Sequence, residues 1–330
     1  AALDGMTARL AQWGRTPNKG QLRQAMIPAG ATVIANPVGS AAGFALEWRG
    51  AIIVSLPGVP REMEAMMTDS VIPLLADRLA RTTRISPQPI TRRIFHTWGV
   101  PEADVDAKLQ GLMPKGAPVD LGLLASPMGV LVSLTTKSGG LRPVSEDQLS
   151  SLVQEVRGRL SDCLFAEGRE TMEEVVGRLL REQGRTVALA ESCTGGLIGH
   201  RLTQVPGSSA YVDRGAICYS NQSKIEMLAV PADLIAKHGA VSQEVAAAMA
   251  KGIRERAGVS VGLSVTGIAG PGGATETKPV GLVYVGLNGG AEGSITKEFR
   301  FHGDRSVIKQ RSSQAALNLL RLWLIDRGRT

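Results

Sequence analysis

The sequence predicts a mixed α/β protein built from several domains, and three observations support this fold class. Segments typical of strands and helices alternate through residues 169–330, as in a layered α/β sandwich domain. Residues 85–168 combine a strand, a turn and a long amphipathic helix, which indicates a small α+β domain. A length of 330 residues suits two domains, or three small ones, at about 150 residues for a typical domain. We therefore expect domains at 1–84, 85–168 and 169–330.

The first domain is expected to contain strands, turns and a closing helix. The apolar run 51–56 predicts a buried strand. A helix then begins near Arg61, and three methionines on one of its faces are typical of core packing rather than of a ligand site. Residues 82–89, which include two prolines, predict a linker.

The two later domains show clear helix starts. In the middle domain a strand at 130–134 and a turn at 138–140 precede a helix, which Ser145 and Gln148 open as a capping box. In the last domain Thr171 and Glu174 form a second capping box. Strands are then expected at 186–190, 215–219, 261–266, 282–287 and 296–301, with helices from 195, at 244–257 and at the end of the chain.

Composition limits the class of protein. Hydrophobic residues make up 43% and charged residues 20%, which excludes a disordered chain, a collagen-like repeat and a small disulfide scaffold. No uncharged apolar run approaches the roughly 18 residues that cross a bilayer, and no signal peptide is visible. Cys163, Cys193 and Cys218 have no paired spacing, which argues against disulfides or a zinc site. We expect a soluble, cytoplasmic protein.

The charge balance favours small anionic ligands over nucleic acid. The chain has 37 basic and 30 acidic residues, a net charge of +7, but the basic residues are scattered. Only 4% of residues are aromatic, too few for a platform that stacks bases. A solvated basic surface of this kind tolerates phosphorylated substrates. We expect no membrane partner and no nucleic-acid partner.

One segment places a serine where a buried strand ends and a helix begins. Ser192 lies at this turn, so its hydroxyl is held outside the sheet edge. Backbone N–H groups of the first helical turn point the same way and can stabilise an anion or oxyanion, while Gly195 and Gly196 let a ligand approach closely. Two interpretations stay open: Ser192 caps the helix, or it is a catalytic nucleophile.

A lysine follows the next strand. Lys224 lies one turn after the strand at 215–219, and the C-terminal ends of strands in a mostly parallel sheet share one edge, so Lys224 can meet Ser192. A partly buried lysine loses its charge more readily, and a neutral amine can accept the serine proton. The two residues together predict a Ser–Lys dyad. Without the pairing to Ser192, the position of Lys224 would favour an ordinary lysine on the exposed face of a helix.

Two further segments offer binding groups. The strand at 261–266 runs into a glycine-rich loop at 267–273, which suits either an anion-binding nest or a plain surface turn. It matches neither the P-loop nor the dinucleotide fingerprint. Thr266, at the strand end, can hydrogen-bond a substrate or the nucleophile. Arg305 can pair with phosphate in a bidentate manner, or form an ordinary surface salt bridge.

Cys193 is the rival nucleophile, because it is adjacent to Ser192. The four histidines are dispersed, and none has a carboxylate partner that the sequence reveals. A Cys–His enzyme is therefore less economical than Ser192 with Lys224. No spacing of His, Cys, Asp or Glu indicates a metal site.

Six motifs occur in the order seen in the C-terminal domain of the CinA family, which residues 170–330 resemble. They are Glu191-Ser192-Cys193-Thr194-Gly195-Gly196, Tyr219-Ser220-Asn221 with Lys224, His238-Gly239-Ala240-Val241-Ser242, Val265-Thr266-Gly267-Ile268-Ala269-Gly270-Pro271-Gly272-Gly273, Lys278-Pro279-Val280-Gly281 and Gly303-Asp304-Arg305. That family domain is a nicotinamide mononucleotide deamidase of pyridine nucleotide salvage. It hydrolyses the carboxamide to give nicotinate mononucleotide and ammonia.

The resemblance implies a role for each matching residue. It makes Ser192 the nucleophile, Lys224 its general base, and Tyr219 and Thr266 active-site hydrogen-bond donors. It assigns substrate binding to Thr194, Gly195, Gly196, Gly270, Gly272 and Arg305, the last as a phosphate or catalytic contact. An acyl-enzyme would form at Ser192, release ammonia and be hydrolysed by water, with no cofactor. Ile308-Lys309 stands where we expect an arginine, so the resemblance does not carry a phosphate contact to that position.

The first two domains also resemble parts of this family. Residues 36–43 and 56–63 are similar to the second half of its N-terminal domain, which is related to molybdopterin-binding domains and in some members is a metal-dependent ADP-ribose pyrophosphatase. The first half, with its Gly-Asp-Glu segment and its aspartates, is absent, so the chain is expected to begin inside that domain and to lack the acidic residues that a phosphate-bound metal needs. A divalent metal is expected only where that domain is complete.

Residues 85–168 occupy the place of the family's KH-type domain. They contain no convincing GxxG loop of the kind that clamps a nucleic-acid backbone. We expect an interdomain or dimerisation role for this domain, and a homodimer. Two functions remain as alternatives to the amidase: ADP-ribose pyrophosphatase in a full-length parent, and a non-catalytic nucleotide-binding protein associated with competence.

Overall fold

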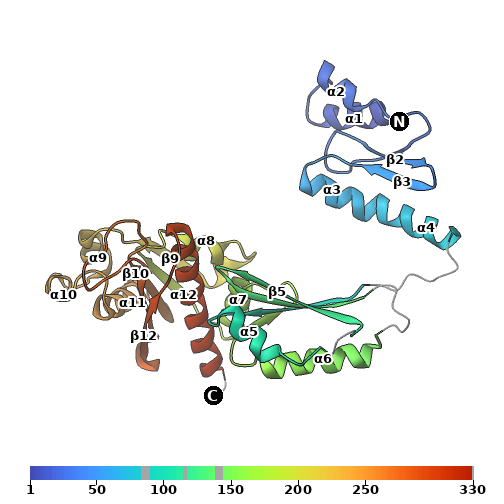
Figure 1. The fold of residues 1–330 in the computed structure, drawn as a ribbon. Helices are drawn as coiled ribbons and strands as arrows, with labels where there is room; N and C mark the ends of the chain where they lie inside the picture. Colours follow the sequence, from blue (N-terminus) through green and yellow to red (C-terminus); the bar gives the residue numbers. More distant parts are fainter. Residues whose placement is uncertain (83–89, 114–116, 138–143, 329–330) are drawn as a thin grey trace. The chain divides into compact units, whose positions relative to one another are not determined.

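The computed structural model describes the chain except for residues 83–89, 114–116, 138–143 and 329–330. It divides into two compact units, residues 1–89 and 90–330, which are described separately (Figure 1). Within the described ranges, no helix combines the length and apolar character required to cross a membrane. The turn expected at 138–140, and all of the expected linker except Thr82, lie outside the described residues.

The first unit contains an antiparallel sheet of three strands in the order β1-β2-β3. Its elements are α1 (Ala2–Gln12), α2 (Lys19–Gln24), β1 (Thr32–Ile34), β2 (Gly43–Trp48), β3 (Ala51–Ser55), α3 (Pro60–Met66), a π-helical turn (Met67–Val71) and α4 (Ile72–Thr82). The expectation of a buried strand at 51–56 is wrong in one respect. The strand forms, but Ala51, Ile53 and Ser55 are exposed because alternate side chains of β3 point away from the core of the first unit.

The second unit begins with an antiparallel sheet in the order β5-β6-β4-β7. Its elements are β4 (Arg92–Thr97), α5 (Glu102–Leu109), β5 (Val119–Ser126), β6 (Gly129–Thr136), α6 (Glu146–Arg159) and β7 (Leu164–Glu167). The capping box predicted at the start of α6 is confirmed, since Ser145 and Gln148 bond each other's backbone N–H groups. Side chains of α5, α6 and the strands enclose a core of their own.

The rest of the second unit is a five-stranded sheet in the order β12-β11-β10-β8-β9, and only β11 runs against the others. Its elements are α7 (Met172–Glu182), β8 (Val187–Glu191), α8 (Leu197–Thr203), β9 (Val212–Ile217), α9 (Asn221–Leu228), α10 (Ala232–His238), α11 (Gln243–Ala257), β10 (Val261–Gly267), β11 (Leu282–Asn288), β12 (Ser294–Arg300) and α12 (Arg305–Arg327). The predicted mixed α/β class is confirmed.

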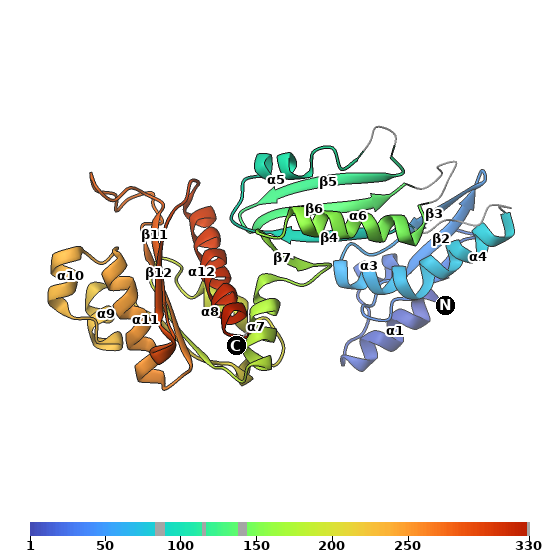
Figure 2. The same ribbon diagram turned by 90° about the horizontal axis from the view of Figure 1, so that it is seen from below.

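Two helical layers cover this sheet (Figure 2). Apolar residues of α7, α8 and α12 pack on one face, and those of α9, α10 and α11 on the other. Each predicted strand of this domain overlaps an observed one, although β9 ends at Ile217 rather than at Tyr219. The predicted capping box at α7 is also confirmed, with Thr171 and Glu174 as its members.

A glycine sets the distance between α11 and α9, the helix that carries Lys224. A Cβ atom on Gly252 would lie 1.9 Å from the carbonyl oxygen of Leu228, in the last turn of α9. Both atoms belong to the backbone or are fixed to it, so no side chain can turn aside to make room. The close contact of the two helices therefore requires glycine at position 252.

We expect Gly252→Ala to destabilise the second unit. The overpacking should cost about 1–3 kcal/mol of unfolding free energy, although alanine is the better helix former by about 1 kcal/mol. Gly158→Ala in α6 is the matched control, because a Cβ there would meet nothing within 4 Å, and we expect it to be neutral or mildly stabilising. Urea unfolding followed by circular dichroism measures both. Equal stability of the two variants would contradict this account of the packing.

Candidate active site

Ser192 and Lys224 are in direct contact. Lys224 Nζ lies 3.0 Å from Ser192 Oγ. Ser192 directly follows β8, and Lys224 lies in the first turn of α9, the helix that follows β9. Because β8 and β9 are parallel neighbours, both side chains reach the same sheet edge. They are 7% and 1% exposed, respectively. The alternative of an exposed helix lysine is therefore wrong.

The surroundings of Lys224 favour its neutral form. Nζ also lies 2.8 Å from the carbonyl oxygen of Cys218 and 3.5 Å from that of Tyr219, and Lys224 forms no ion pair with any described carboxylate. Burial lowers the pKa of Lys224 below the ordinary lysine value of 10.5. In a neutral amine the two N–H groups can serve the two carbonyls. The remaining lone pair then faces the hydroxyl of Ser192.

Glu191 directly precedes Ser192, and the sequence reasoning gave it no role. Its buried carboxylate accepts hydrogen bonds from the N–H groups of Gly196, Ile198 and Gly199, at 3.0, 3.1 and 2.8 Å. The expectation that N–H groups of the first helical turn face a ligand is therefore wrong for these donors, because Glu191 occupies them. Glu191 also caps α8 in place of Ser192. A glutamate at the end of a buried strand was the available signal, since a buried carboxylate needs donors and a helix N-terminus supplies them.

The two predicted glycines shape the turn between Ser192 and α8. Gly195 and Gly196 have φ angles of +60° and +92°, a region that favours glycine. The N–H of Gly195 donates to the carbonyl oxygen of Ser192 at 3.1 Å, which closes the turn. The N–H groups of Cys193 and Thr194 donate to no acceptor in the described part of the chain. They are the backbone donors of this turn that remain available.

Cys193 is poorly placed to act as the nucleophile. Its side chain is 4% exposed and belongs to the apolar core beneath the sheet. Burial raises the pKa of the Cys193 thiol to about 12. Because the thiolate is the reactive form of cysteine, very little of the nucleophile would exist near neutral pH.

The two predicted threonines are enclosed, and neither hydroxyl is bonded to Ser192. Thr266 is fully buried and donates to the carbonyl oxygen of Ala240 at 2.8 Å. Thr194 is also fully buried, and its hydroxyl has no partner among the residues that the structure describes. In this conformation neither hydroxyl is presented to a substrate.

Arg305 forms a second cluster with two other predicted residues, Gly270 and Tyr219. Its Nη1 donates to the carbonyl oxygen of Gly270 at 2.8 Å, and its Nη2 donates to the hydroxyl oxygen of Tyr219 at 2.7 Å. Tyr219 is 60% exposed. The alternative of a surface salt bridge is wrong for the described residues, because Arg305 pairs with no carboxylate among them. Gly272 lies in the exposed loop beyond Gly270 and makes no close approach that a Cβ would block.

Lys309 completes the surroundings of the turn. It follows Arg305 by one helical turn on the same face of α12. Its Nζ lies 3.6 Å from the position that a Cβ on Gly195 would occupy. The sequence reasoning set this residue aside as a departure from a family pattern, so it missed this placement.

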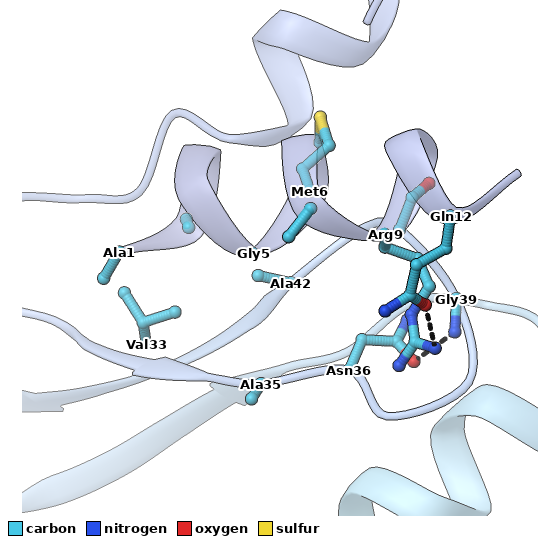
Figure 3. A pocket seen from close by; sticks show the side chains of 13 residues that line it. Ala1, Gly5, Met6, Arg9, Gln12, Val33, Ala35, Asn36, Gly39 and Ala42 are labelled. Carbon is cyan, nitrogen blue, oxygen red and sulfur yellow. Dashed lines mark hydrogen bonds between the residues drawn. The ribbon is translucent and has the colours of Figure 1, made fainter. Parts of the chain in front are cut away.

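A cavity of about 390 Å³ lies in the first unit between α1 and the loop after β1, where Arg9 lies near Asn36 and Gly39 (Figure 3). It contains none of the predicted site residues. In the described ranges, no group of three or more His, Cys, Asp or Glu side chains is placed to hold a metal ion.

Comparison with known proteins gives consistent matches. Residues 169–324 match the family described as the CinA C-terminal domain, and residues 92–166 match the damage-inducible protein CinA KH domain. The chain is 44% identical over 310 residues to a putative competence-damage inducible protein of Halothermothrix orenii, covering 94% of this chain and 72% of that protein. It is 46% identical over 312 residues to a CinA-like protein of Citrifermentans bemidjiense, covering 93% and 71%.

Among solved structures, the competence/damage inducible protein CihA from Agrobacterium tumefaciens is 39% identical in sequence. The match covers 46% of this chain and 94% of that one, with a TM-score of 0.45.

Glu191→Ala should destabilise the protein, because three N–H groups would lose their charged acceptor. We expect a loss of about 2–4 kcal/mol in unfolding free energy, and a smaller loss for Glu191→Gln, which keeps one acceptor oxygen. Glu170→Ala is the control, since the ion pair between Glu170 and Arg178 is partly exposed and should contribute no more than about 1 kcal/mol. Urea titrations of the three variants test this, and a Glu191→Ala loss no larger than the control would refute the capping role.

Proposed function

This chain belongs to the CinA family, and we propose that it is an amidohydrolase that converts nicotinamide mononucleotide to nicotinate mononucleotide and ammonia. The observation that carries the proposal is the 3.0 Å contact between Lys224 Nζ and Ser192 Oγ, in surroundings that lower the pKa of the lysine. A serine beside a neutral amine is an activated nucleophile suited to acyl transfer. The choice of substrate rests on the motifs shared with the family. The homodimer, expected together with a dimerisation role of residues 85–168, stays a prediction.

The first half of the reaction forms an acyl-enzyme. Neutral Lys224 accepts the proton of Ser192, and Oγ forms a bond to the carboxamide carbon, whose oxygen becomes an oxyanion. The carbon–nitrogen bond then breaks, and the Lys224 ammonium returns the proton to the departing nitrogen. Ammonia leaves, and the nicotinoyl group remains as an ester on Ser192.

The second half restores the enzyme. Neutral Lys224 accepts a proton from water, whose oxygen bonds to the ester carbon. The bond to Ser192 Oγ then breaks, and the serine regains its proton from Lys224 as nicotinate mononucleotide is released. Both halves use one base in the same place, because the lysine is neutral again after each leaving group departs. No cofactor enters this scheme.

In this proposal, backbone N–H groups of the turn between Ser192 and α8 act as the donors to the oxyanion. With the donors at the start of α8 bound to Glu191, the N–H groups of Cys193 and Thr194 remain for the developing charge. The N–H after a nucleophilic serine has this role in other strand-to-helix turns. Fixed donors of this kind stabilise the transition state without reorganising. Arg305 acts at a distance by holding Tyr219 and Gly270 together.

Variants of the dyad test the proposal directly. With EDTA present, we expect ammonia release from nicotinamide mononucleotide, and a loss of at least about 1,000-fold in Ser192→Ala. Lys224→Arg should lose at least about 100-fold, because arginine keeps the positive charge but cannot accept a proton.

Cys193→Ala is the matched control and should remain active. Release that survives in Ser192→Ala, or is lost in Cys193→Ala while the chain stays folded, would reject Ser192 as the nucleophile. No release from the folded parent chain would reject the amidase and favour a binding protein.

The pH profile should report the lysine. Only the neutral amine accepts the serine proton, so kcat/KM should rise as pH rises towards and through the lowered pKa of Lys224, and then level off. The rise should come below the ordinary lysine value of 10.5. Initial rates at low substrate concentration between pH 5 and 10 measure it. A profile that falls across this range would show that the charged lysine is the active form.

A further inference from the structure

We propose that Lys278 is a positioning residue of the amidase, which holds the end of β10 in place beside Ser192. Lys278 lies in the loop between β10 and β11, and its side chain reaches the segment that joins α10 to α11. This role rests on the proposed function, because the group that it supports is the nucleophile. Lys278 itself makes no contact with the substrate in this proposal.

The amine of Lys278 is bound to backbone carbonyls. Its Nζ donates to the carbonyl oxygen of His238 at 2.6 Å and to that of Val241 at 2.7 Å. Lys278 is partly buried, and it forms no ion pair with a carboxylate of the described residues. His238 is the last residue of α10, where carbonyls lack partners within the helix and a positive charge is favourable. Lys278 therefore joins segments that are 37 and 40 positions apart in the chain.

The backbone supports this contact on both sides. Gly239 has a φ angle of +75°, a region that favours glycine, and a Cβ atom there would lie 2.9 Å from Lys278 Nζ. A side chain at position 239 would therefore push the amine away from its acceptors. In the loop, the N–H of Thr275 donates to the carbonyl oxygen of Lys278 at 2.9 Å, and the N–H of Lys278 donates to Thr275 Oγ1 at 3.1 Å. These bonds fix the backbone from which the lysine side chain extends.

The segment that Lys278 holds also contacts the end of β10. Within this segment, the carbonyl oxygen of Ala240 accepts a hydrogen bond from the hydroxyl of Thr266 at 2.8 Å. The preceding carbonyl of β10, that of Val265, accepts the N–H of Ser192 at 3.0 Å. Thr266 and Val265 are both fully buried, so a shift of Ala240 would be passed on through packed groups. Loss of the Lys278 bonds would therefore loosen the strand end that supports the nucleophile.

Lys278→Met tests this role, because methionine is an unbranched side chain of similar size that donates no hydrogen bond. For nicotinamide mononucleotide we expect kcat to fall about 10–100-fold with little change in KM, since a displacement of about 1 Å can cost on the order of 100-fold in rate. Lys278→Arg, which keeps the charge and the donors, should retain more of the rate than Lys278→Met. Lys237→Met is the matched control, because Lys237 is an exposed lysine of α10, and it should leave both constants unchanged. An unchanged kcat in Lys278→Met, or a loss confined to KM, would overturn the proposal.

A double-mutant cycle shows whether Lys278 acts through Thr266. Thr266→Val removes the hydroxyl that bonds to Ala240 and keeps the branched shape of the side chain. If both residues hold the same strand end, Lys278→Met should lower kcat by no more than about threefold in the Thr266→Val background. Full additivity of the two losses would place the effect of the lysine elsewhere and overturn the proposal.

Amide hydrogen exchange of the full chain, followed by mass spectrometry, does not depend on turnover. In Lys278→Met, peptides that contain the hydrogen-bonded amides of Gly239, Thr275 and Lys278 should exchange about 10-fold faster, as in a local opening. The rest of the second unit should keep the parent rate, and Lys237→Met should change nothing. Faster exchange throughout the unit would show general destabilisation and overturn the proposal.

The two kinds of measurement separate this proposal from the amidase itself. If the parent chain releases no ammonia, the amidase fails, and faster exchange confined to these peptides still supports the hold of Lys278 on the two segments. If ammonia is released but kcat and local exchange are unchanged in Lys278→Met, this proposal fails alone.

Discussion

The structure of this domain depends on a lysine amine enclosed without a counter-charge. Lys224 is 1% exposed, and its three acceptors are a hydroxyl and two carbonyls rather than a carboxylate. Such a site can exist only if the amine can become neutral, because an isolated buried ammonium is strongly disfavoured. The parallel pairing of β8 with β9 fixes the two chain segments, and the close contact of α11 with α9 at Gly252 keeps the layer above them tight. The sheet therefore positions the amine of Lys224 beside Ser192, and the burial that results lowers the pKa of the lysine.

Two adjacent side chains at the end of β8, those of Glu191 and Ser192, have different partners. Glu191 faces the start of α8 and satisfies its donors, whereas Ser192 faces Lys224. A carboxylate suits the positive end of a helix. Its presence there also removes the commonest structural use of a serine at such a turn, which is capping. The hydroxyl of Ser192 is left with the amine as its partner, and Cys193 points into the core.

Periodicity in the sequence was sufficient to predict most of the C-terminal domain, because alternation of strand and helix patterns is local. The strand expected at 186–190 is Val187–Glu191, and the expected meeting of Ser192 with Lys224 followed from the sheet edge alone. Partner choice was not predictable in the same way. Whether Arg305 meets a carboxylate or a tyrosine depends on segments far apart in the chain, because Tyr219 precedes Arg305 by 86 positions. The exposure of alternate residues in β3 was not predictable either, since an apolar run does not reveal whether one face of its sheet is left uncovered.

Two lysines, Lys224 and Lys309, lie near the turn that follows Ser192, and they differ in how far their amines are enclosed. Lys224 is surrounded by backbone carbonyls and a hydroxyl, and burial shifts it towards the form that accepts protons. Lys309 is only partly buried, and its Nζ lies 3.6 Å from the position that a Cβ on Gly195 would occupy. Lys224 has three acceptors within 3.5 Å of its Nζ, whereas the Lys309 amine has no hydrogen-bond or ion-pair partner among the described residues. Enclosure among uncharged acceptors therefore distinguishes Lys224 from Lys309, although the two residues carry the same side chain.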